Sequence, residues 1–141
     1  MRLEQCFEVA APREACAAAL REDEALTRLF PDARTEIVAR DDHRKTVVSH
    51  YRALGREGDA TFHFEFEDAG DVRFAKVCDG RVWRKLEGRV HLEPRGEGTR
   101  VTLAMEGRTK GLVPEFAIKG PLEEQLQQMA GSLRQRMEAL G

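Results

Sequence analysis

The chain has 141 residues, of which 41% are hydrophobic and 34% charged, and its formal net charge is −2. This length corresponds to one domain, residues 1–141, with a single core. The interleaved charges provide no basic surface for nucleic acid, and no apolar run is long enough to cross a membrane. Cys6, Cys16 and Cys78 show neither CxxC nor ligand-like spacing, so we expect reduced thiols, no metal site and a cytoplasmic protein.

The N-terminal residues predict one strand followed by two short helices. Residues 2–10 alternate between apolar and polar side chains, as a half-buried strand does. Pro12 suits the first turn of a short helix, and a second helix is expected to begin near Asp23 and to end before Pro31. Because two short helices bury little by themselves, we expect them to close one end of a sheet.

Between residues 35 and 107 the hydrophobic period changes to two, which indicates strands. The strand-like runs are 35–40, 45–52, 60–67, 72–78, 81–93 and 99–106. Their connections are short and contain Gly or Asp, so consecutive strands should pair antiparallel as a meander.

The alternation also predicts the register of the central strands. We expect a three-residue loop at 78–80 with Gly80 left-handed, because a two-residue loop would mix polar and apolar faces. The expected pairs are Phe74–Arg84, Lys76–Val82 and Val72–Leu86 across this loop, and Phe66–Val72, Phe64–Phe74 and Phe62–Lys76 across the preceding turn. The apolar face then holds Phe62, Phe64, Phe66, Val72, Phe74, Val82, Leu86, Val90 and Leu92.

The last stretch, 121–140, predicts a long amphipathic helix. Its apolar residues recur in steps of three and four: Leu122, Leu126, Met129, Leu133, Met137 and Leu140. This stripe must be buried, and the apolar sheet face is the surface that suits it. Residues 109–120 contain Gly and Pro, so we expect a broken helical turn and a kink at Pro121, serving as a gate or a static crossover.

Two charged residues interrupt the apolar face. Lys76 lies near a strand end, from which its ammonium can reach water. Arg84 lies in the body of its strand, where a buried guanidinium needs a polar partner such as a ligand's carboxylate, phosphate or carbonyl. The alternatives are an internal carboxylate, Glu36 or Glu106, and a bulge that turns Arg84 outward.

His50 differs from the other histidines because it alternates with Val48 along a predicted strand. It neighbours Tyr51, so one of the two points inward, and parity does not decide which. An inward imidazole or phenol is a candidate acid or base for a bound carbonyl. His63 and His91 fall on the solvent face. We assign no catalytic residue, because the sequence contains no nucleophile elbow, phosphate loop or paired-carboxylate motif.

Three stretches resemble the START-like (SRPBCC) superfamily of polyketide cyclases and lipid-transfer proteins. They are FEVAAPREACAAAL (7–20), EALTRLFPDA (24–33) and VHLEPRGEGTRVTL (90–103), which resemble the family's opening strand and helix, its second helix and its penultimate hairpin. The likeness covers essentially the whole chain and is greatest to small bacterial members of the cyclase/dehydrase-like, quinone-binding and carbon monoxide dehydrogenase G-subunit types. It implies an α+β helix-grip fold, with a seven-stranded antiparallel sheet wrapped around a long C-terminal helix.

The resemblance further implies a cavity between sheet and helix for a lipid, quinone or polyketide-like ligand. The wall and polar groups that we expect are Phe62, Phe64, Phe74, Leu86, Val90, Met105, Phe116, Leu126, Met129, Arg84, Lys76, His50 and Tyr51. Our first hypothesis is a carrier or sensor of a hydrophobic small molecule, without a cofactor. The alternatives are a cyclase or dehydratase using His50, Tyr51 and Arg84, and an interaction module with a filled core. Transient membrane contact and the choice between monomer and homodimer stay open.

Overall fold

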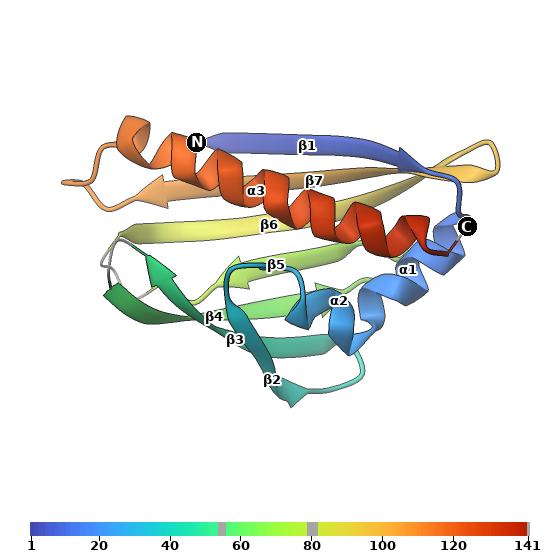
Figure 1. Ribbon diagram of the computed structural model, residues 1–141, viewed down its shortest axis with the longest axis horizontal. Helices are drawn as coiled ribbons and strands as arrows, with labels where there is room; N and C mark the ends of the chain where they lie inside the picture. Colours follow the sequence, from blue (N-terminus) through green and yellow to red (C-terminus); the bar gives the residue numbers. More distant parts are fainter. Residues whose placement is uncertain (54–55, 79–81, 141) are drawn as a thin grey trace.

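A computed structural model describes residues 1–53, 56–78 and 82–140 (Figure 1). The elements in chain order are β1 (Arg2–Val9), α1 (Arg13–Arg21), α2 (Asp23–Thr27), β2 (Arg34–Arg40), β3 (Arg44–Ala53), β4 (Arg56–Phe66), β5 (Val72–Lys76), β6 (Trp83–Arg95), β7 (Gly98–Thr109) and α3 (Glu115–Glu138). The strands form one seven-stranded sheet in the order β1-β7-β6-β5-β4-β3-β2, with every neighbouring pair antiparallel. This confirms the expected α+β helix-grip architecture.

The helices cover one face of the sheet, which we call the inner face. The long helix α3 packs along β1 and β7, and α1 and α2 lie at the end where α3 finishes (Figure 1). They also contact β6, β7 and β2. The two short helices therefore close one end of the sheet, as the sequence predicts.

The core lies between the inner face and α3. The sheet contributes Phe62, Phe64, Phe66, Val72, Phe74, Leu86, Val90 and Leu92, all of them buried. The helix contributes Leu122, Leu126, Met129, Leu133 and Met137. Leu140 of the predicted stripe is 44% exposed, because α3 ends at Glu138.

The long helix begins earlier than predicted. It starts at Glu115, so the expected broken turn before Pro121 is wrong for residues 115–120. Pro121 lies inside the helix, where it removes the hydrogen bond that its nitrogen would donate to Ala117. The long apolar stripe beyond it is buried, and this burial stabilises the helix despite the missing bond.

The predicted register is confirmed on one side of β5 and wrong on the other. Phe66 pairs with Val72 across the first turn, as expected, but Phe74 pairs with Gly88 rather than Arg84. A Cβ at position 88 would lie 2.3 Å from Cζ of Phe74, so the phenyl ring occupies the space of a side chain. The shift is by an even number of residues, which leaves the apolar face intact apart from Val82. The expected left-handed Gly80 lies outside the described residues.

Candidate functional site

The inner face is filled near α1 and α2. A cavity of about 10 Å³ lies there, room for about one water molecule. It is surrounded by Leu20, Leu26, Leu29, Phe64, Val72, Phe74, Val90, Leu103, Met129 and Leu133. The predicted wall residues Phe64, Phe74, Val90 and Met129 therefore pack as core in this half of the molecule, and they leave no space for a ligand between them.

A β-bulge decides which side chains of β6 face inward at the other end. The pairing of β6 with β7 shifts between Trp83 and Lys85, which leaves Arg84 as the additional residue. Trp83 packs against the core, and a Cβ at Gly107 would lie 2.6 Å from its Cζ3 atom. Arg84 is exposed, so its prediction as an inward ligand anchor is wrong. Packing an indole over a glycine costs less than burying an unpartnered guanidinium.

Arg84→Met is therefore expected to change the free energy of unfolding by less than about 0.5 kcal/mol, because surface substitutions are usually close to neutral. Thermal and urea denaturation of the parent and the variant measure this. A loss of several kcal/mol would mean instead that Arg84 is held by an internal carboxylate.

Among the described residues, the inner face is less buried at the end of β3 and the start of β4, and we call this region the open end. Tyr51 is 41% exposed, and Lys76 and Trp83 are half-buried, although all three lie on the inner face. Tyr51 lies against β4, since a Cβ at Gly58 would be 2.8 Å from its hydroxyl oxygen. Lys76 pairs across the strands with buried Phe62. This open end thus combines an apolar floor with polar groups.

Lys76 is the predicted cation that does lie on the inner face. Within residues 1–53, 56–78 and 82–140, no carboxylate forms an ion pair with its ammonium. A half-buried lysine that pairs with no carboxylate among the described residues is available to a polar or anionic group of a ligand.

His50 and Phe116 do not lie on the inner face. His50 is on the outer side of β3, where its Nδ1 lies 2.6 Å from a carboxylate oxygen of Asp59 and its Nε2 lies 2.9 Å from one of Glu36. These hydrogen bonds, that of Glu36 first, raise the pKa of His50. Phe116 is 84% exposed at the start of α3. The structure therefore does not bring His50, Tyr51 and Arg84 together for acid–base chemistry.

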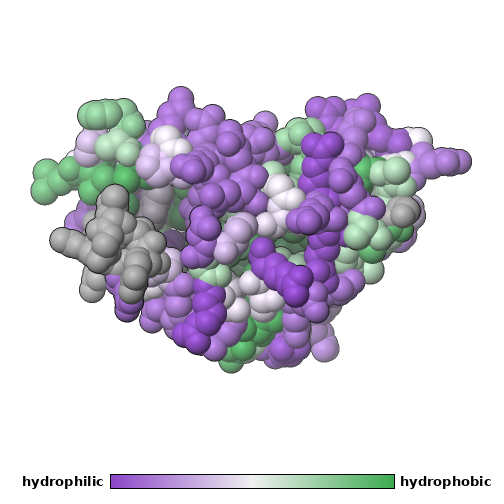
Figure 2. Space-filling model, viewed as in Figure 1, coloured by the Kyte–Doolittle hydropathy of each residue, from purple (hydrophilic) through white to green (hydrophobic). Residues whose placement is uncertain are grey.

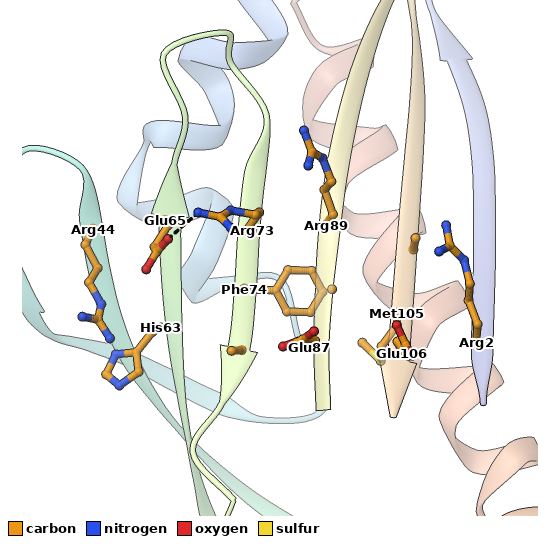
Figure 3. A pocket seen from close by; sticks show the side chains of 13 residues that line it. Arg2, Arg44, His63, Glu65, Arg73, Phe74, Glu87, Arg89, Met105 and Glu106 are labelled. Carbon is orange, nitrogen blue, oxygen red and sulfur yellow. Dashed lines mark hydrogen bonds and ion pairs between the residues drawn. The ribbon is translucent and has the colours of Figure 1, made fainter. Parts of the chain in front are cut away.

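The outer face carries a groove of about 450 Å³ (Figure 3). Arg73 lies 2.9 Å from a carboxylate oxygen of Glu65 and 3.0 Å from one of Glu67. Arg89 bonds the other oxygen of Glu67 and also Asp71. Because these charges pair with one another along the strands, we interpret this groove as a solvated sheet face rather than a ligand site.

Asp71 is a buried carboxylate that bonds several residues of this outer network. Its role was not predicted from the sequence. Its side chain is 6% exposed. One carboxylate oxygen accepts hydrogen bonds from Arg89 at 2.7 Å and His91 at 2.6 Å, and the other accepts from the Leu92 amide at 3.0 Å. Burial raises the pKa of Asp71, but the hydrogen bonds from His91, Leu92 and Arg89 outweigh it, and the pKa lies below its ordinary value. The alternation of apolar and polar residues does not predict the burial of a turn residue such as Asp71, because its bonding partners lie on another strand.

A seven-stranded antiparallel sheet that grips a long C-terminal helix, closed at one end by two short helices, defines the START-like helix-grip fold. Solved structures of other proteins share this fold. An aromatase/cyclase, Zhui, from Streptomyces sp. R1128 is similar over 99% of this chain and 92% of its own, with a TM-score of 0.76 and 15% identity. A START superfamily protein of Mycobacterium smegmatis is similar over 99% of both chains, with a TM-score of 0.77 and 21% identity.

A STAR-related lipid transfer protein of Xanthomonas axonopodis is similar over 96% of this chain and 85% of its own, with a TM-score of 0.72 and 19% identity. At these identities the likeness concerns the fold. No protein-family model matches the chain, and no curated protein matches it significantly.

Two further observations bear on possible partners. In the described part of the chain, no group of three or more His, Cys, Asp or Glu side chains is placed to hold a metal ion. No helix there is both long enough and apolar enough to pass through a bilayer.

Proposed function

We propose that the protein binds a hydrophobic small molecule with a polar or anionic head at the open end of the inner face. The observation that supports this most directly is the partial exposure of Tyr51, Lys76 and Trp83 on a face that elsewhere is buried and apolar. A site with an apolar floor and few polar groups is typical of small-molecule binding.

The side chains at this end indicate how such a ligand would lie. Phe62 and Leu86 are buried beneath this end, and the half-buried Trp83, which lies with Leu86 over Gly107, offers apolar surface to a chain or ring. Lys76 provides a positive charge, and Tyr51 a hydroxyl group, to the head. A fatty acid, a quinone or a polyketide-like molecule combines these properties.

The fold agrees with this proposal, since the similar structures include proteins described as a lipid transfer protein and an aromatase/cyclase. His50 is bound between Asp59 and Glu36 on the outer side of β3, and Arg84 is exposed at the bulge, so the geometry of these residues does not favour a cyclase or dehydratase activity. Cys6, Cys16 and Cys78 are free, which suits the reducing cytoplasm that we propose as the location.

Freshly purified protein is expected to carry a ligand that native mass spectrometry detects as added mass. Without bound material, the same protein should bind an anionic fluorescent dye such as anilinonaphthalene sulfonate saturably, and dodecanoate should displace it. Absence of both co-purified mass and saturable binding would favour the filled interaction module.

Lys76→Met is expected to weaken dodecanoate binding about tenfold, which corresponds to about 1.4 kcal/mol, and to leave dodecanol binding unchanged. The matched control is Lys85→Met, because Lys85 belongs to the same end of the sheet but bonds Glu87 at 3.1 Å. If the Lys76 variant binds dodecanoate and dodecanol more weakly by the same factor, the lysine lies outside the head-group site.

A further inference from the structure

Two large apolar side chains project into solvent beside the open end. Leu112 is 98% exposed and Phe116 is 84% exposed, and Val82 nearby is 39% exposed. Figure 2 shows hydrophobic surface at the end of the molecule where Figure 1 places the connection from β7 to α3. Full exposure of a leucine and a phenylalanine is unfavourable in water and indicates a surface that contacts something else.

The segment that carries these side chains is held in a defined turn. The Val113 amide donates to the Lys110 carbonyl at 2.8 Å, and the Thr109 hydroxyl donates to the Val113 carbonyl at 2.7 Å. The Lys110 amide also donates to the carbonyl of Val82 at 2.9 Å, which ties the turn to the start of β6. Leu112 is therefore presented to solvent by an ordered backbone.

Exposed lysine and arginine side chains accompany these apolar residues along the chain. Lys110 and Lys119 are exposed and flank Leu112 and Phe116 in the sequence, and Arg84, two residues after Val82, is exposed as well. Within residues 109–120 the charged side chains are Lys110, Lys119 and Glu115, two positive and one negative, whereas the chain as a whole has a net charge of −2. Glu123 and Glu124 are exposed further along α3. The acid in the segment, Glu115, lies 3.8 Å from the N-terminal ammonium, which offsets its charge.

We propose that this apolar–basic tip, formed by Val82, Leu112, Phe116, Arg84, Lys110 and Lys119, docks on an anionic lipid bilayer. Apolar side chains inserted at the acyl boundary, with lysines and arginines at the head groups, are the arrangement that interfacial binding requires. A second copy of the chain fits less well, because face-to-face tips would bring like charges together. A few projecting side chains also provide less contact area than a stable protein interface needs.

The test is co-sedimentation of the full chain with vesicles of phosphatidylcholine, with and without phosphatidylglycerol. We expect binding to the anionic vesicles and weaker binding at higher salt. The double variant Leu112→Ser with Phe116→Ser should abolish binding. The double variant Lys110→Gln with Lys119→Gln should weaken it by about fivefold for each lysine removed.

Two control variants remove the same kinds of side chain elsewhere. Val38→Ser removes an apolar residue that is 54% exposed on β2, and Arg28→Gln removes an exposed cation beyond α2. Both should bind the anionic vesicles as the parent does. The proposal is overturned if the parent does not bind these vesicles at low salt, or if the tip variants bind as well as the controls.

Sedimentation velocity without lipid tests whether the tip binds a second copy of the chain instead. Self-association of the parent that disappears in the Leu112 and Phe116 variant would assign the tip to that second copy. Docking does not depend on the proposed ligand. The tip variants should keep the parent's affinity for dodecanoate in solution, so failure of either proposal can be recognised separately.

Discussion

Met129→Asp is expected to prevent stable folding of the protein. Met129 is 0% exposed, in the middle of the stripe through which α3 packs on the sheet. A carboxylate there would be buried without a partner, or protonated at a cost in free energy, and we expect a loss of at least about 4 kcal/mol. That is a large part of the total stability of a domain of this size. Circular dichroism during thermal and urea denaturation measures it.

Two controls separate packing from helix propensity. Gln127→Asp places the same residue on the exposed side of the same helix and should cost about 0.5 kcal/mol or less. Met129→Leu keeps the volume and the apolar character and should cost less than about 1.5 kcal/mol. If Met129→Asp melts within a degree of the parent, α3 does not pack through this stripe.

Asp71→Ala is expected to lower the free energy of unfolding by about 2–3 kcal/mol. The substitution leaves the buried Leu92 amide without its acceptor and removes the anion that Arg89 and His91 share. Arg89 and His91 side chains are 46% and 52% exposed, so water replaces part of what they lose and the effect stays below that of a fully buried pair. Urea denaturation near neutral pH measures the difference.

The same variant has a defined pH dependence. Because the pKa of Asp71 in the folded protein lies below its ordinary value of 3.8, its contribution to stability is complete above that value and is lost as the pH falls through the lower folded pKa. The stabilities of parent and variant should therefore converge in acid. Asp68→Ala, in the same turn but exposed, should show neither effect. A difference that persists unchanged in acid would mean that the carboxylate charge is not responsible.

The sequence by itself determined the architecture of this protein, because periodicity is a property of the chain and each face of an element must meet water or core. The steps between Leu122 and Met137 predict the buried stripe of α3, and the alternation through Phe62, Phe64 and Phe66 predicts the inner face. Short connections with Gly or Asp predict antiparallel neighbours. The resemblance to START-like proteins added the order in which these elements assemble.

Tertiary structure decided the details on which the candidate site depends. Whether Arg84 or Trp83 faces inward follows from a bulge, and the bulge follows from the space above Gly107 on another strand. The register of β5 with β6 likewise follows from the Phe74 ring over Gly88. Such preferences arise between residues far apart in the chain, so local periodicity does not contain them.

Contacts between residues far apart in the chain also decided the surroundings of several side chains that the sequence did not predict. Tyr51 and His50 are adjacent, and it was the pairing of β3 with both its neighbours that placed the phenol on the inner face and the imidazole between Glu36 and Asp59. Asp71 gained its role from partners on β6, and Phe116 became exposed because α3 begins at Glu115. Burial and hydrogen bonding depend on what the rest of the fold places beside a side chain, and that is settled when the sheet closes around the helix.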